Sequence, residues 1–272
     1  MGSGSWGTHA VEVAGRRVVK RFPRGDGGRA AREWRALTLL ARHAPGLAPE
    51  PLEAGLGAVE PVVVMSRLDG KPLRGAVLGS EQIDALAEAV AALHVALPSG
   101  VLDGVPPRPG HQAELIGHLR EWAGAARPRA GGLVRQGMDA GLAWLAASGL
   151  DADGARGVPP VFGPGDGNLA DYLWDGSRVR IVDFEESGRS DRAFELAEIT
   201  EHVGSWVDAP LDVPAFLDRF DLSAAEAARL PRCRRLLALV WLFLLAGDDP
   251  DRPRNPPGTA ERQVGRLLEL LA

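Results

Sequence analysis

Three aspartates in the second half of the chain stand at a spacing that could support the transfer of a phosphoryl group. Asp166 lies in a Gly-Asp-Gly-Asn sequence, Asp171 follows five positions later, and Asp183 comes after the apolar pair at 181–182. Phosphoryl transfer requires mainly that a protein positions the nucleophile and neutralises the phosphates. In such a reaction Asp166 would orient an acceptor hydroxyl and take its proton. Asp171 and Asp183 would hold Mg²⁺, a hard cation that prefers carboxylate oxygens.

A Gly-Asp-Gly-Asn sequence alone is usually a turn, because Asp and Asn side chains bond to their own backbone. The catalytic interpretation depends on the combination of this sequence with Asp183. Asp183 lies near the end of a predicted strand, and its separation from Asp166 along the chain is the one that kinases use. The motif is therefore a hypothesis that only its structural context can support.

Short strands set between long helices would carry these aspartates. β-branched and aromatic residues predict strands over Val158–Phe162, Asp171–Trp174 and Arg178–Phe184. Apolar residues at helical spacing predict helices over 80–97, 112–126, 132–148, 191–207, 223–246 and 259–271, with Pro231 as a candidate break in the fifth.

The first seventy residues differ from the rest and predict a small sheet covered by one helix. Strands are expected over Ala10–Val13, Arg17–Phe22 and Pro61–Met65, and a helix over Ala30–His43. Asp69-Gly70 and Pro72 mark a connection to the helical part. We therefore expect an α+β fold of two lobes. The small N-terminal antiparallel sheet lobe would span residues 1–68, and the mainly helical C-terminal lobe residues 69–272.

The stretch 165–197 resembles the aminoglycoside phosphotransferase and choline kinase family. The family pattern is His-Gly-Asp, four residues, Asn, a strand that ends in Ile/Val-Asp-Phe/Trp-Glu, then Gly, an Asp-containing turn and Asp-Leu-Ala. The matching residues here are Pro164-Gly165-Asp166, Asp171, Ile181-Val182-Asp183-Phe184-Glu185, Gly188, Asp191 and Glu195-Leu196-Ala197. The resemblance implies a bilobal protein-kinase-like fold. It also implies that Asp166 is the catalytic base and that Asp171 and Asp183 are the metal ligands.

Three positions depart from the family pattern. Pro164 replaces a histidine that usually buttresses the catalytic loop, and Asp171 replaces an asparagine, which adds a negative charge beside the metal. Glu195 replaces an aspartate and is one methylene longer at a site that is usually structural.

The N-terminal residues match the family less specifically. By resemblance, Lys20 pairs with the nucleotide phosphates and Glu33 is its carboxylate partner. The resemblance also implies a short loop that covers the phosphates, at Gly4, Ser5 and Gly7, and a hinge that grips adenine, at Met65, Arg67 and Leu68. From the residues alone, Lys20 could instead be a solvated lysine of an edge strand, and Glu33 could face water beside Arg32.

The resemblance implies ATP or another nucleoside triphosphate, with Mg²⁺, as the phosphoryl donor and a hydroxylated small molecule as the acceptor. Between Asp183 and Asp218 the chain has ten acidic residues and two arginines. This run could be a solvated helix face, as charge runs usually are, or an acidic groove that concentrates a cationic acceptor. The identity of the acceptor is not predicted.

Composition restricts the class of protein. The formal charge of −5 argues against a nucleic-acid partner, because phosphate backbones attract clustered Lys and Arg. The longest apolar run, Leu236–Ala246, is shorter than the roughly 20 residues that span a bilayer. A lone cysteine and the absence of a signal peptide lead us to expect a cytoplasmic protein without a membrane partner. The oligomeric state is not predicted.

Two histidines have ordinary interpretations at this point. His94 lies near an apolar helical stripe, where a packed core histidine is more common than a ligand. Glu198 and His202 stand one helical turn apart, but two residues do not make a zinc site.

Two other functions remain open from the sequence. The chain could be a nucleotide-binding pseudokinase with a regulatory or scaffolding role, which Pro164 and the short glycine loop would favour. It could also be a Mg²⁺-dependent hydrolase that uses the three aspartates without a nucleotide. That reading leaves Lys20 and Glu33 unexplained.

Overall fold

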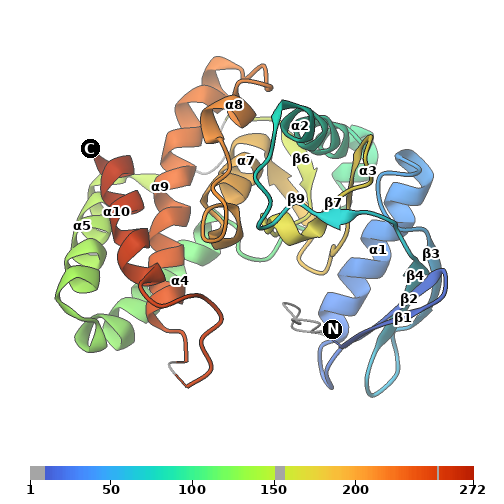
Figure 1. Cartoon of the computed structure of the whole chain (residues 1–272), viewed down its shortest axis with the longest axis horizontal. Coiled ribbons are helices and arrows are strands. Elements are labelled where there is room, and N and C mark those ends of the chain that lie inside the picture. The colour runs from blue at the N-terminus through green and yellow to red at the C-terminus, as the bar shows by residue number, and fades with distance from the viewer. Residues whose placement is uncertain (1–9, 151–156, 250) are drawn as a thin grey trace.

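The first lobe is a four-stranded antiparallel sheet packed against one helix. The computed structural model describes residues 10–150, 157–249 and 251–272. The sheet order is β1-β2-β4-β3, and its elements are β1 (Ala10–Ala14), β2 (Arg17–Arg21), α1 (Gly27–His43), β3 (Pro51–Gly55) and β4 (Val62–Ser66). Helix α1 lies along one side of this sheet (Figure 1). It buries Ala30, Glu33, Ala36, Leu37 and Leu40, which share one face at helical spacing.

Two small sheets connect this lobe to the helices. Strand β5 (Lys71–Pro72) pairs with β7 (Tyr172–Trp174), which pairs with β8 (Val179–Ile181). Strand β6 (Pro160–Gly163) pairs with β9 (Gly188–Asp191). Figure 1 shows β6, β7 and β9 between the first sheet and the C-terminal helices. The loops that follow β6 and β8 carry the predicted catalytic residues, so these short strands position them.

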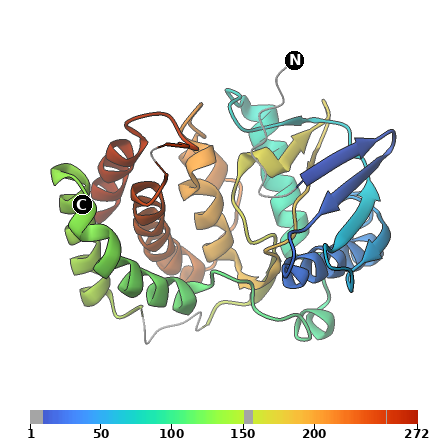
Figure 2. The same ribbon diagram turned by 90° about the horizontal axis from the view of Figure 1, so that it is seen from below.

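Helices make up most of the second lobe. They are α2 (Ser80–His94), α3 (Ser99–Leu102), α4 (Gln112–Ala126), α5 (Gly132–Ser148), α7 (Arg192–Glu201), α8 (Val213–Leu217), α9 (Ala224–Ala246) and α10 (Thr259–Leu271). Helix α10 packs on both α5 and α9, and these three helices lie together in both views (Figures 1 and 2). Gly137 and Gly141 allow the close approach, because a Cβ there would overlap side chains of α9 and α10.

The expected α+β architecture, a small antiparallel sheet lobe followed by a mainly helical lobe, is confirmed, and so are most of the predicted elements. Strand β3 was not predicted, because its sequence Pro-Leu-Glu-Ala-Gly lacks β-branched residues. The helix predicted over 191–207 is too long, since α7 ends at Glu201 and a 3₁₀ turn follows over Val203–Ser205. The candidate break at Pro231 is wrong, because α9 continues through it with Leu230 and Cys233 buried on either side.

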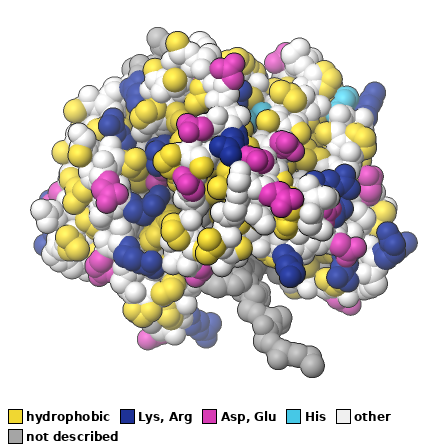
Figure 3. Space-filling view, turned by 45° about the horizontal axis from the view of Figure 1, so that its top comes forward, with side chains coloured by type: hydrophobic (Ala, Val, Ile, Leu, Met, Phe, Trp, Pro, Cys, Tyr) yellow, Lys and Arg dark blue, Asp and Glu magenta, His cyan; other side chains and the backbone are white. Residues whose placement is uncertain are grey.

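The apolar core is continuous across both lobes. It includes Leu37 and Leu40 of α1, Phe162 and Phe184 near the catalytic loops, and Leu239 of α9. In the described ranges, no helix combines the length and the apolar character that a membrane crossing requires. On the face drawn in Figure 3, acidic and basic side chains are interspersed rather than gathered in a basic stripe.

Candidate active site

A cavity of about 310 Å³ collects the three aspartates that the sequence singled out. Its walls come from the loop after β6, the segment after β8, the residues that follow α7, and α9. The lining residues are Arg74, Asp166, Asn168, Ala170, Asp171, Asp183, Glu185, Glu186, His202, Val203, Trp241, Arg254 and Asn255. A larger cavity of about 480 Å³ beside α4 and β9 contains none of the predicted residues. The chemistry therefore points to the smaller cavity.

Lys20 joins the first lobe to this cavity through three carboxylates. Its Nζ lies 3.1 Å from Glu33 Oε2, 2.7 Å from Asp183 Oδ1 and 2.7 Å from Glu185 Oε2. Lys20 and Glu33 are both buried, so neither is a solvated surface residue. Burial alone would lower the pKa of Lys20, but the three carboxylates outweigh it and keep the pKa above its ordinary value. The ammonium stays charged and ties α1 to the segment after β8.

Asp183 adopts an unusual backbone conformation. Its φ is +66°, and it is the one non-glycine residue with positive φ in the described chain. Such conformations cost of order 1–3 kcal/mol and persist where the surroundings hold them. The next residue supplies that support, because Phe184 is fully buried and its N–H donates to Glu33 Oε2 at 2.9 Å. The strained turn directs the Asp183 carboxylate toward both Lys20 and the cavity.

Asp166 is held by its own loop. Asn168 N–H donates to Asp166 Oδ1 at 3.0 Å, and Ala170 N–H donates to Asn168 Oδ1 at 3.2 Å. The turn that these residue types favour is therefore present. It also leaves the Asp166 side chain 44% exposed at the cavity, so the turn and the catalytic interpretation are compatible.

Glycines let the catalytic loop pack tightly. Gly165 has φ +85°, and a Cβ on it would lie 1.9 Å from the carbonyl oxygen of Glu186. A Cβ on Gly167 would lie 2.2 Å from the carbonyl oxygen of Glu198. The loop thus rests directly on the segment after β8 and on α7.

Asp171 has the electrostatics expected of a cation ligand. Burial raises the pKa of its carboxyl well above the usual range, and the negative charges of Asp166 and Asp183 raise it further. Within the described ranges its carboxylate has no hydrogen-bond or ion-pair partner. A half-buried carboxylate of this kind beside two others fits a divalent cation with oxygen ligands.

A second set of three carboxylates, which shares Asp183 with the first, lies closer together around Lys20. Glu33, Asp183 and Glu185 form the one set in the described residues whose oxygens lie within 4.8 Å of one another. The Lys20 ammonium contacts all three. A metal at this set would have to compete with Lys20, whereas no cation of the described residues forms an ion pair with Asp171.

Arg108 supports the loop that carries Asp166, next to Pro164. It is buried, and its Nη2 donates to the carbonyl oxygen of Gly165 at 2.7 Å. Its Nη1 lies 3.1 Å from both Glu195 Oε1 and Glu198 Oε2. The longer Glu195 thus binds the same arginine that holds the loop. No local motif predicted Arg108, which lies in the Pro-rich stretch 106–109.

The acidic run between Asp183 and Asp218 is mixed, since its first three members line the cavity and its last three are exposed. Its central members are buried in α7 and at its start, and arginines neutralise them. The ion pairs are Asp191 with Arg229, Glu195 and Glu198 with Arg108, and Glu201 with Arg234 and Arg266. These four carboxylates are structural, so neither sequence interpretation describes the whole run. Asp183, Glu185 and Glu186 alone of the run line the cavity.

The other predicted nucleotide contacts are only partly described. Gly4, Ser5 and Gly7 lie outside the described residues. Met65 is buried in β4, Arg67 is exposed, and Leu68 is half-buried in the connection to β5. That connection is anchored, since Arg67 N–H donates to the carbonyl oxygen of Arg16, and Arg180 donates to that of Asp69.

His202 is a cavity residue that the sequence did not identify as functional. Its Nε2 lies 3.2 Å from Asp166 Oδ1. In the sequence it was considered only as a partner of Glu198 in a zinc site, and Glu198 forms an ion pair with Arg108 instead.

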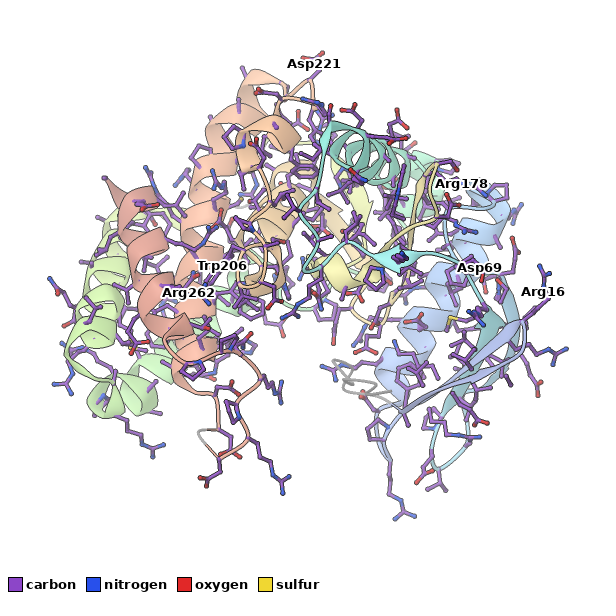
Figure 4. All side chains as sticks on the ribbon, in the orientation of Figure 1. Arg16, Asp69, Arg178, Trp206, Asp221 and Arg262 are labelled. Atoms are coloured by element: carbon purple, nitrogen blue, oxygen red, sulfur yellow. The ribbon has the colours of Figure 1, made fainter. Side chains whose placement is uncertain are left out.

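A cation–π contact lies outside the cavity. The guanidinium carbon of Arg262 lies 5.2 Å from the centroid of the Trp206 ring (Figure 4).

Comparison with known proteins gives a consistent family. The profile of the phosphotransferase enzyme family matches residues 8–237. No curated protein sequence matches the chain significantly.

Solved structures share the fold at low sequence identity. An apo thermostable mutant of the aminoglycoside phosphotransferase APH(4)-Ia is 18% identical, with a TM-score of 0.65 over 96% of this chain and 88% of that one. Choline kinase LicA from Streptococcus pneumoniae is 14% identical, with a TM-score of 0.60 over 98% and 91%. Another APH(4)-Ia mutant, in a ternary complex with ADP and hygromycin B, is 16% identical, with a TM-score of 0.63 over 96% and 88%.

Proposed function

This chain belongs to the phosphotransferase enzyme family, and we propose that it transfers the γ-phosphoryl group of ATP, with Mg²⁺, to a hydroxyl group of a small molecule. The observation that carries the proposal is the position of Lys20. It pairs with Glu33 of the same lobe and with Asp183 of the other lobe, and Asp183 lines one cavity with Asp166 and Asp171. A cation and three carboxylates thus meet where a triphosphate and a divalent ion would require them.

Each residue has a proposed role in this reaction. Lys20, oriented by Glu33, binds phosphate oxygens of the nucleotide. Asp171 and Asp183 would hold Mg²⁺, which neutralises phosphate charge when bound. The Lys20 ammonium also contacts Asp183 and Glu185.

Asp166 acts on the acceptor. Its carboxylate aligns the hydroxyl and takes the proton as the acceptor oxygen bonds to the γ-phosphorus. The bond from that phosphorus to the β–γ bridging oxygen breaks, and ADP leaves with the electron pair. The balanced products are ADP, the phosphorylated acceptor and one proton.

The acceptor would enter beside Trp241. The catalytic cavity and an adjoining cavity of about 540 Å³ share Trp241, Arg254 and Asn255, and the second is also lined by Leu244 and Leu245. An indole with neighbouring aliphatic side chains suits an apolar portion of an acceptor, and the arginine and amide suit its polar groups. The carboxylates of α7 are already paired with arginines, so they offer no attraction to a cationic acceptor.

The test is an acceptor screen that detects the product directly. Purified protein is incubated with ATP, Mg²⁺ and a panel of hydroxylated compounds that includes aminoglycosides, amino alcohols, sugars and nucleosides. ADP release is measured, and ³¹P NMR identifies a phosphomonoester. Formation of such an ester supports the proposal. Nucleotide binding without phosphate transfer to any acceptor would indicate a pseudokinase, and failure to bind nucleotide would favour a carboxylate-based hydrolase.

A further inference from the structure

His202 is fixed in a single ring orientation beside Asp166. The N–H of Gly204 donates to His202 Nδ1 at 2.9 Å, and Trp241 contacts the ring edge-to-face at a centroid distance of 4.5 Å. Because Nδ1 accepts a hydrogen bond, the proton of the neutral imidazole lies on Nε2. Nε2 is the atom that lies 3.2 Å from Asp166 Oδ1.

The backbone at Gly204 packs tightly against the His202 ring and Asn168. A Cβ on Gly204 would lie 2.6 Å from Asn168 Oδ1 and 3.0 Å from His202 Nδ1. Gly204 therefore packs between the histidine and the catalytic loop. His202 itself is buried, although it follows the end of α7 in an irregular stretch. Close packing of the backbone at Gly204 therefore holds the buried imidazole beside Asp166.

Both contacts to the Asp166 carboxylate converge on one oxygen. Asn168 N–H and His202 Nε2 both face Oδ1, at 3.0 Å and 3.2 Å. Among the described residues no group donates to Oδ2. We propose that His202 is a positioning residue whose Nε2, 3.2 Å from Asp166 Oδ1, holds that oxygen in place and so presents Oδ2 to the acceptor hydroxyl. This inference rests on the proposed role of Asp166 as the base.

The uncharged state of His202 suits this role. Burial lowers the pKa of His202 to about 4, and the neighbouring Arg74 lowers it too, against the opposing effect of Asp166. A neutral donor orients the carboxylate without the full positive charge of an imidazolium. A full charge would stabilise the carboxylate and weaken it as a base.

A second buried histidine shows that burial alone does not require such contacts. His94 is also buried, but neither of its ring nitrogens has a hydrogen-bond partner in the part of the chain that the structure describes. His94 lies at the end of α2 and does not line the catalytic cavity. It therefore provides a matched control for the loss of an imidazole.

The kinetic test compares His202→Leu, His202→Gln and His94→Leu. The reaction is ATP hydrolysis with Mg²⁺ and water as the acceptor, repeated with any acceptor found by the screen. His202→Leu should lower kcat roughly 10- to 100-fold, as expected when a reacting group is misplaced by about 1 Å, with little change in the KM for ATP. His202→Gln retains an amide donor and should recover most of this loss. His94→Leu should leave kcat unchanged.

Two kinetic outcomes would overturn the proposal. One is wild-type kcat in His202→Leu. The other is equal loss of kcat in the Leu and Gln variants, because the ring would then act only by packing against Trp241. An ATP-induced thermal shift like that of the wild type establishes that each variant is folded and binds nucleotide.

A spectroscopic test does not depend on turnover. Long-range ¹H–¹⁵N correlation spectra of the imidazoles report the tautomer of each histidine. We expect His202 in the Nε2–H form, with Nε2 and Hε2 resonances that move in Asp166→Ala, while those of His94 do not. An Nδ1–H tautomer, or His202 resonances that ignore Asp166→Ala, would overturn the inference. A protein that shows the coupled resonances but never turns over would instead refute the proposed function alone.

Discussion

Arg108 donates a hydrogen bond from Nη2 to the carbonyl oxygen of Gly165 at 2.7 Å, one residue before the proposed base Asp166. The same guanidinium neutralises Glu195 and Glu198. It therefore ties the catalytic loop to α7 at the point where the sequence has a proline in place of the family's histidine. A loop that lacks the usual buttress is supported from a different part of the chain.

Removal of this arginine should destabilise the protein strongly. Arg108→Met leaves two buried carboxylates without a cation, which typically costs about 3–5 kcal/mol. Urea unfolding followed by circular dichroism measures the change. Arg127→Met is the matched control, because it removes an arginine from an exposed ion pair with Asp139 and should leave stability unchanged. Equal midpoints for the two variants would show that Arg108 does not support the loop.

Variants of the Lys20–Glu33 pair should affect the stability of the protein and its catalytic activity differently. Lys20→Met leaves the buried Glu33 carboxylate uncompensated and should lower the melting temperature. The double variant Lys20→Met/Glu33→Met replaces the pair with apolar groups and should regain much of that stability. Kinase activity should remain lost in both, since both lack the Lys20 ammonium that is proposed to bind the phosphates. Activity in the double variant would contradict the proposed role of Lys20.

Metal dependence should appear as a thermal shift. Saturation to about 100 times Kd stabilises a protein by about 2.7 kcal/mol, which corresponds to about 5–10 °C at this chain length. We expect such a shift with ATP and Mg²⁺ and a smaller one with ATP and EDTA. Asp171→Ala should abolish most of the Mg²⁺-dependent part. A shift that is the same with and without Mg²⁺ in the wild type would contradict the assignment of Asp171 as a ligand.

His94 should make stability depend on pH. Burial lowers the pKa of His94 to about 3, and nearby Arg192 lowers it further, while Glu226 opposes both. The unfolded-state value is about 6.5, so the folded protein favours the neutral ring. This contribution is complete above pH 6.5 and is lost as the pH falls toward 3. Linkage predicts a loss of about 2 kcal/mol between pH 7 and pH 5.

The comparison of His94→Leu with the wild type isolates this effect. Unfolding free energies are measured in urea at pH 7 and pH 5. The variant should lose about 2 kcal/mol less than the wild type over this interval. Parallel losses in the two proteins would show that His94 does not titrate on unfolding.

The sequence predicted the fold and three of the cavity aspartates because these depend on local spacing. A loop, a strand and the residue after it fix where Asp166, Asp171 and Asp183 lie relative to one another. Lys20 and Glu33 were identified by resemblance, and the structure adds Glu185 as a further partner of Lys20.

Arg108 and His202 could not be predicted in the same way. Arg108 lies 57 residues from Gly165 and 87 from Glu195, so no periodic pattern connects them. His202 was placed within a helix, where its side chain would follow the helical face. In the structure the helix has already ended, and the irregular backbone brings the ring to Asp166. Tertiary packing decides both contacts, and the acidic run is paired with arginines for the same reason.

The most direct test of the proposed function is the turnover of Asp166→Asn with ATP and Mg²⁺ and the acceptor found by the screen. The amide keeps the shape of the carboxylate but cannot take a proton, so kcat should fall by about 10²- to 10⁴-fold. The thermal shift with ATP and Mg²⁺ should match that of the wild type. Asp139→Asn, on the exposed face of α5, should behave as the wild type in both measurements. Wild-type turnover in Asp166→Asn would contradict the account.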